Sequence, residues 1–189
     1  MAIERLYLQP EQGARLFDRP IQDLQRALAA NVSYLTHVFG RCERLVKEIN
    51  GQRRYTPNVY RGKDDYILLT PDNRDLGNYA FFVLDEPERF GVFPRMRAPF
   101  SLIVWVDMRT FEQNDDRNIF QLEMDILRVV SGHGVLRQGS VSVERVYHKA
   151  ENVFEGFTLD EVDNQFLMSP YCGLRLQGEL IINEDCITV

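Results

Sequence analysis

Apolar residues recur at steps of three and four from Ile21 to Ile49, which is the spacing of one face of an α-helix. The chain then reaches Asn50-Gly51, and glycine readily adopts the left-handed conformation that ends a helix. The pattern therefore predicts helix between residues 21 and 49, with Cys42 on its apolar side as a small core residue. Asn31 and Ser33 are good N-cap residues, so an unbroken helix and one broken near residue 31 both remain open.

The rest of the chain is dominated by strand patterns. In Phe100–Met108 the apolar residues Leu102–Val106 follow one another without alternation, which is typical of a strand covered on both faces. Further runs predict strands at Tyr66–Thr70, Tyr79–Leu84, Ser140–Tyr147 and Leu174–Ile182. A helix of about 14 residues should follow Asn114-Asp115-Asp116 and end at Ser131-Gly132.

The segments between these runs carry the signals of loops and turns. Proline and Asx residues favour turns at Tyr55–Asn58 and Thr70–Asp75. We also expect an irregular loop over Phe90–Pro99 and a loop over Asn152–Phe166, with a helical turn at Thr158–Val162.

Several strands follow one another without an intervening helix, which favours antiparallel pairing. We therefore predict an α+β fold, a mostly antiparallel β-sheet with helices packed on it. Residues 1–20 are expected to form an N-terminal arm, and residues 21–189 a single domain.

The charge of the chain is uneven. The formal net charge is −6, and from Glu151 onwards eight acids accompany a single base, Arg175. Four bases and no acid lie between Gln52 and Lys63, interleaved with two tyrosines: Arg53, Arg54, Tyr55, Tyr60, Arg61 and Lys63. This basic cluster fits a solvated loop, a phosphate-binding patch, or a face that meets the acidic C-terminal region of a second copy. The overall negative charge disfavours nucleic acid as the main partner.

Motifs of enzyme chemistry are missing from the sequence. The three histidines are isolated, there is no Cys-x-x-Cys pair, and no Gly-x-Ser-x-Gly or Gly-Lys-Ser/Thr occurs. We expect no catalytic residue, no cofactor and no metal ligand. A hydrolase that uses scattered carboxylates or Cys172 remains the alternative.

Cysteine usage and hydropathy bear on where the chain works. Three widely spaced cysteines suit a reducing compartment, the first residues lack an apolar signal core, and the longest apolar runs have only five residues. A cytoplasmic protein that does not span a membrane is expected.

Aromatic residues are frequent in the predicted loops, and exposed aromatics mark interfaces. With the basic cluster they make up the candidate interaction residues: Arg53, Arg54, Tyr55, Tyr60, Arg61, Phe93, Phe154 and Phe157.

Five strings carry a resemblance that spans nearly the whole chain: Asn31–Arg41, Tyr55–Asn58, Pro99–Trp105, Asp163–Leu167 and Pro170–Arg175. Together they resemble a family of uncharacterised proteins from prophage-like regions of Bacteroides-type bacteria. More distantly, the order of elements resembles phage tail terminator and tail completion proteins, which form rings that cap the tail tube and join it to the head. The resemblance implies a non-enzymatic structural protein that binds copies of itself and other proteins of a phage-like particle assembling in the cytoplasm.

Overall fold

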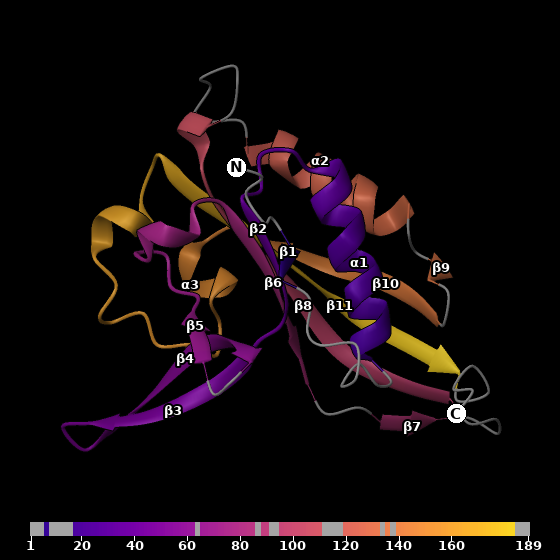
Figure 1. Ribbon diagram of the computed structural model, residues 1–189, viewed down its shortest axis with the longest axis horizontal. Coiled ribbons are helices and arrows are strands. Elements are labelled where there is room, and N and C mark those ends of the chain that lie inside the picture. Colours follow the sequence, from indigo (N-terminus) through magenta and orange to yellow (C-terminus); the bar gives the residue numbers. More distant parts are fainter. Residues whose placement is uncertain are drawn as a thin grey trace.

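One mixed eight-stranded sheet runs through the protein, and a smaller three-stranded sheet lies beside it (Figure 1). The computed structural model describes residues 6–7, 17–62, 65–85, 88–90, 95–110, 119–132, 135–136 and 139–183. The large sheet has the order β1 (Leu6–Tyr7), β2 (His37–Arg41), β6 (Tyr79–Leu84), β8 (Arg95–Asp107), β11 (Tyr171–Asn183), β10 (Gly139–Tyr147) and β9 (Val135–Leu136). The short β7 (Glu88–Phe90) pairs with β8 as well.

Most strand pairs in the protein are antiparallel. Only β1 with β2 and β2 with β6 run parallel among the described strands. The second sheet has the order β3 (Glu43–Ile49), β4 (Gln52–Gly62) and β5 (Asp65–Leu68), and it is antiparallel throughout. The predicted α+β class is therefore confirmed.

Two helices cover one face of the large sheet, α1 (Asp18–Asn31) and α2 (Ile119–Gly132) (Figure 1). Ile21, Leu24 and Leu28 recur along α1 at helical spacing and are buried in the same cluster as Leu122 and Ile126 of α2. The apolar periodicity thus turns one side of each helix to the sheet. No helix in the described ranges is both long enough and apolar enough to cross a membrane.

The other face of the large sheet is covered by the three-stranded sheet and by the segment that contains α3 (Ala150–Val153) and the 3₁₀ helix Asn164–Leu167. A second core lies there, formed by residues such as Phe39, Phe81, Ile103, Trp105 and Phe154. Because core lies on both sides, residues 100–106 of β8 are buried without interruption, as the apolar run Leu102–Val106 within them predicts.

Residues 37–41 and 43–49 correct the sequence prediction, since they form β2 and β3 rather than helix. Val38 and Phe39 are adjacent and both fully buried, one in each core, which only a strand between two covered faces achieves. Steps of three and four arise here by chance. Asn50-Gly51 is the turn of the β3–β4 hairpin, with φ of 53° and 74°, the conformation that Asn-Gly favours in two-residue hairpins.

Of the other elements predicted from the sequence, some are confirmed and some are wrong. The strands at β6, β8, β10 and β11 and the second helix are confirmed, apart from small differences at their ends. Tyr55–Asn58 is strand rather than turn, because β3 and β5 pair with β4 on its two sides. In the expected Phe90–Pro99 loop, Phe90 ends β7 and residues 95–99 begin β8. Around the expected loop Asn152–Phe166, α3 ends at Val153 and a 3₁₀ helix begins at Asn164. At the expected turn Thr158–Val162, the Val162 N–H donates to the Leu159 carbonyl at 2.9 Å, which closes a single turn rather than a helix.

The first twenty residues contain two regular elements. Leu6–Tyr7 pairs with Val38–Phe39 in the large sheet, and α1 begins at Asp18. Residues 1–5 and 8–16 lie outside the described residues.

Candidate functional site

The basic cluster lies largely on β4, and its two adjacent arginines differ in environment. Arg53 is exposed, whereas the side chain of Arg54 is only 18% exposed. The Arg54 guanidinium lies 3.3 Å from Glu161 and 3.8 Å from Asp160, both in the acidic C-terminal region. Arg54 of the basic cluster therefore meets the acidic region within one chain, and contact between two copies remains a prediction.

Tyr55 and Tyr60 connect β4 to its neighbours. The Tyr55 N–H donates to Thr158 Oγ1 at 3.0 Å, and its carbonyl accepts from the Thr158 N–H at 2.8 Å. Thr158 thereby pairs with the edge of β4 at a position beyond the end of β5. The Tyr60 ring lies 5.2 Å from that of Tyr66 on β5. Phe93, Lys63 and the Arg61 side chain lie outside the described residues.

The aromatic candidates Phe154 and Phe157 belong to the second core. Phe154 is 1% exposed and its ring centroid lies 5.3 Å from that of Trp105. Phe157 is half-buried, with the Arg44 guanidinium 5.5 Å from its ring centroid. A ring that is almost fully buried offers no surface to a partner, so Phe154 acts here in core packing.

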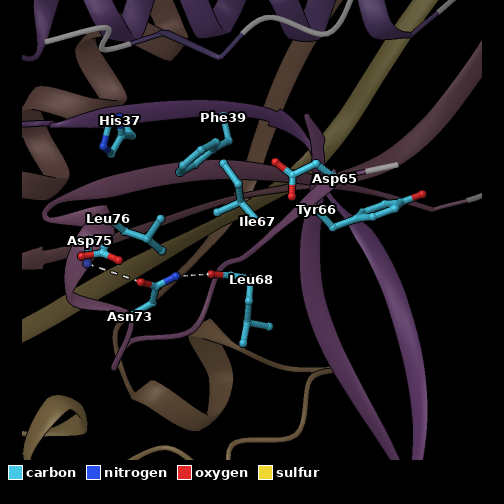
Figure 2. Close-up of a pocket in the computed structure, with 9 residues that line it drawn as sticks. All are labelled: His37, Phe39, Asp65, Tyr66, Ile67, Leu68, Asn73, Asp75 and Leu76. Atoms are coloured by element: carbon cyan, nitrogen blue, oxygen red, sulfur yellow. Dashed lines mark hydrogen bonds between the residues drawn. The ribbon is translucent and has the colours of Figure 1, made fainter. Parts of the chain in front are cut away.

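A pocket of about 320 Å³ lies between β2, β5 and the turn at residues 73–76 (Figure 2). Its lining combines apolar and ionisable side chains: His37, Phe39, Asp65, Tyr66, Ile67, Leu68, Asn73, Asp75 and Leu76. In the view of Figure 2, His37 and Asp75 lie toward one end of the pocket and Asp65 toward the other, with Ile67 between them. The pocket therefore has an apolar middle, with a histidine and an aspartate toward one end and an aspartate toward the other.

The backbone of β5 also faces this pocket. The Leu69 N–H donates to the Pro57 carbonyl, so alternation along an antiparallel strand turns the N–H and C=O of Ile67 to β4 and those of Tyr66 and Leu68 away from it. The Leu68 carbonyl accepts from Asn73 Nδ2 at 2.8 Å. Among the described strands only β4 pairs with β5, so the peptide groups of Tyr66 and the Leu68 N–H lie on the side of β5 without a strand partner.

A second pocket, of about 420 Å³, lies where the end of α1 approaches α2, lined by Asn31, Ser33, Tyr34, Asp125, Arg128 and Val129. Tyr34 is its aromatic member, and burial raises the pKa of this phenol well above its usual value. The hydroxyl therefore stays protonated at neutral pH.

The two described cysteines have poorly reactive thiols. Burial raises the pKa of Cys172 to about 12, with a smaller contribution from Asp107, and burial also raises the pKa of Cys42 to about 12. Since the thiolate is the nucleophile, the environment of Cys172 does not favour the hydrolase alternative in its cysteine form. Cys186 lies outside the described residues.

The ionisable groups of the described ranges are scattered. Within these ranges, no group of three or more His, Cys, Asp or Glu side chains is arranged to hold a metal ion. The sequence does not predict that His37 and Asp75 line one pocket, because this depends on residues 37–41 being a strand. If Asn50-Gly51 is interpreted as a hairpin turn rather than a helix end, the residues before it are expected to be strand rather than helix.

No known protein-family model matches the chain, and no curated protein is significantly similar to it.

Proposed function

We propose that this chain is a non-enzymatic structural protein of a phage-like particle, of the tail terminator or tail completion kind. It acts by associating with copies of itself and by docking partner proteins. The phage-like setting rests on the resemblance of the five strings given above. The mode of action rests on the geometry of the three-stranded sheet.

The observation that supports association is that this small sheet has two outer strands, β3 and β5, each of which pairs on one side only among the strands that the structure describes. Open strand edges carry unpaired N–H and C=O groups and are templates for another chain. One edge, β5, borders the pocket and suits an extended segment of a partner protein. The other edge, β3, lies on the outside of the projecting hairpin (Figure 1).

Light scattering coupled to size-exclusion chromatography, over a wide concentration range, tests the proposal. We expect masses above the 22.1 kDa of one chain at high concentration, and rings or short tubes in electron micrographs. A monomer at every concentration, together with no assembly in micrographs, would contradict it.

The alternative is a hydrolase-like enzyme, and the pocket beside β5 is the observation that favours it, because His37 and two aspartates line that pocket. An imidazole and carboxylates are the groups that general acid–base catalysis uses. Turnover of generic ester or phosphoester substrates that His37→Ala and Asp75→Asn both abolish, with unchanged folding, would establish it. Turnover that survives both substitutions would reject the pocket as the active site.

A further inference from the structure

The outer edge of β3 is open in the described structure. β4 occupies one side of β3, and no described strand pairs with its other side. Figure 1 shows the β3–β4 hairpin projecting from the body, with β3 on its outer side. Val46, in the middle of β3, is 56% exposed, so its side chain is available to a partner.

The side to which each β3 residue turns its N–H and C=O groups follows from its pairing with β4. The peptide groups of Tyr55 point to Thr158, away from β3, so Tyr55 and Val46 are a pair without mutual hydrogen bonds. Lys47 therefore bonds to β4, and the N–H and C=O groups of Val46 point outward. By the same alternation those of Arg44 and Glu48 also point outward.

The side chains of these same three residues share one face of the sheet, because residues two apart in a strand point the same way. Arg44 and Glu48 flank Val46 symmetrically and carry opposite charges. Both are exposed. The edge is therefore complementary to itself when it is rotated by half a turn.

From this we infer that β3 is a self-pairing interface, on which the β3 of a second copy adds antiparallel with Val46 facing Val46. In this register Arg44 faces Glu48 of the second copy at both ends, and the three outward-pointing residues of each strand exchange N–H···O=C bonds in facing pairs. Opposite charges directly across an antiparallel pair stabilise it. The two small sheets become one continuous sheet around a twofold axis, an isologous contact.

The second copy fits this edge better than an unrelated strand does. If the register is shifted by one residue, residues that bond to β4 in one strand face outward-pointing residues of the other, and the backbone bonds cannot form. If it is shifted by two residues, Arg44 lies opposite Val46, and the apolar pair at the twofold axis is lost. The register centred on Val46 satisfies backbone pairing, apolar contact and both ion pairs together. The inference rests on the proposed self-association and assigns a surface to it.

Charge reversal tests the register. Arg44→Glu places two carboxylates opposite each other at both ends of the interface, and Glu48→Arg places two guanidinium groups there. Each variant alone should weaken dimerisation by about ten-fold, because two favourable charge pairs become repulsive. An equimolar mixture should regain wild-type affinity, since at both ends an acid of the Arg44→Glu chain then faces a base of the Glu48→Arg chain.

Lys47→Glu is the matched control, because it makes the same change of charge on the opposite face of β3, where the facing residue would be Leu45. Its dimerisation should equal that of the wild type in sedimentation velocity. Circular dichroism and thermal melting of each variant check the fold, since Arg44 also lies over the Phe157 ring.

A disulfide test gives independent evidence. In a Cys186→Ser background, Val46→Cys should form a covalent dimer under mild oxidation, because facing residues in a hydrogen-bonded antiparallel pair have Cα atoms about 5.5 Å apart, within disulfide range. Leu45→Cys should remain monomeric on a non-reducing gel, because in this register Leu45 faces Lys47 rather than its own copy.

The outcomes separate the interface from the proposed function. A wild-type chain that is monomeric at every concentration, together with no assembly in micrographs, overturns both. An oligomer that neither charge reversal weakens leaves self-association standing and overturns the β3 interface. Weakening without recovery in the mixture, or equal cross-linking at residues 45 and 46, overturns the antiparallel register. Recovery in the mixture, with cross-linking at residue 46 alone, supports the interface.

Discussion

Asn78 is a buried polar residue on which several segments converge, and its removal gives the clearest test of how the fold is held together. The residue is 3% exposed. Its Nδ2 donates to the Tyr34 carbonyl at 2.9 Å and to Thr110 Oγ1 at 2.6 Å, and its Oδ1 accepts from the Asp107 N–H at 2.8 Å. One amide thus joins the α1–β2 loop to the end of β8 and the turn after it.

The perturbation is Asn78→Ala, which removes all three side-chain bonds. Each bond contributes about 1 kcal/mol net, and a buried group left without a partner costs about 1–3 kcal/mol. The Asp107 N–H and the Tyr34 carbonyl both lose the Asn78 amide as a partner. We expect a loss of about 3 kcal/mol in the free energy of unfolding, which lowers the melting temperature by roughly 10 °C for a chain of this length.

Urea unfolding followed by the fluorescence of Trp105, the only tryptophan, measures this change. The midpoint should fall while the slope against urea stays constant, as for a change in native-state stability alone. The control is Asn73→Ala in the turn before β6, where the side chain bonds the Leu68 carbonyl and the Asp75 N–H in an exposed setting. We expect that variant to lose about 1 kcal/mol or less. Equal effects of the two substitutions would refute the argument that burial makes the Asn78 bonds important.

Three further predictions concern charged and thiol groups. Arg54→Ala should raise amide hydrogen exchange over residues 158–162, since the guanidinium holds that segment through its carboxylates, and an unchanged exchange rate would contradict this. Hydrogen bonding from Arg109 lowers the pKa of Asp107, so the ionised Asp107 stabilises the fold above its unfolded-state pKa, and this stabilisation is lost as the pH falls through its pKa in the folded protein. The difference in unfolding free energy between wild type and Asp107→Asn should therefore shrink in acid, as urea titrations at several pH values can measure. Cys172, with its pKa raised to about 12, should react with a thiol reagent at pH 8 far more slowly in the folded protein than in urea, and equal rates would show that it is accessible as thiolate.

Elements with a strong local signal could be predicted from the sequence. The continuous apolar run of β8, the alternation in β10 and β11, and the helical spacing in α1 all specify their structure through the residues themselves. The α+β class followed from their order. The candidate site was harder to predict from the sequence, because the pocket beside β5 forms only if residues 37–41 are a strand.

Contacts between residues far apart in the chain explain what the sequence analysis missed. Arg54 is paired with acids more than a hundred positions away, and Phe154 is buried against Trp105 rather than exposed. Neither partnership leaves a local pattern. The basic cluster therefore looked like a free surface, although one of its arginines is already neutralised within the chain.

The sequence by itself determined the elements whose apolar periodicity admits one structure, together with the class of fold their order allows. Tertiary structure alone decided the state of residues 32–49, where helical spacing is overridden once β2 lies beside β6 and β3 pairs with β4. The physical reason is that hydrogen bonds in a helix are local, whereas a strand is stable only through partners that other parts of the chain supply.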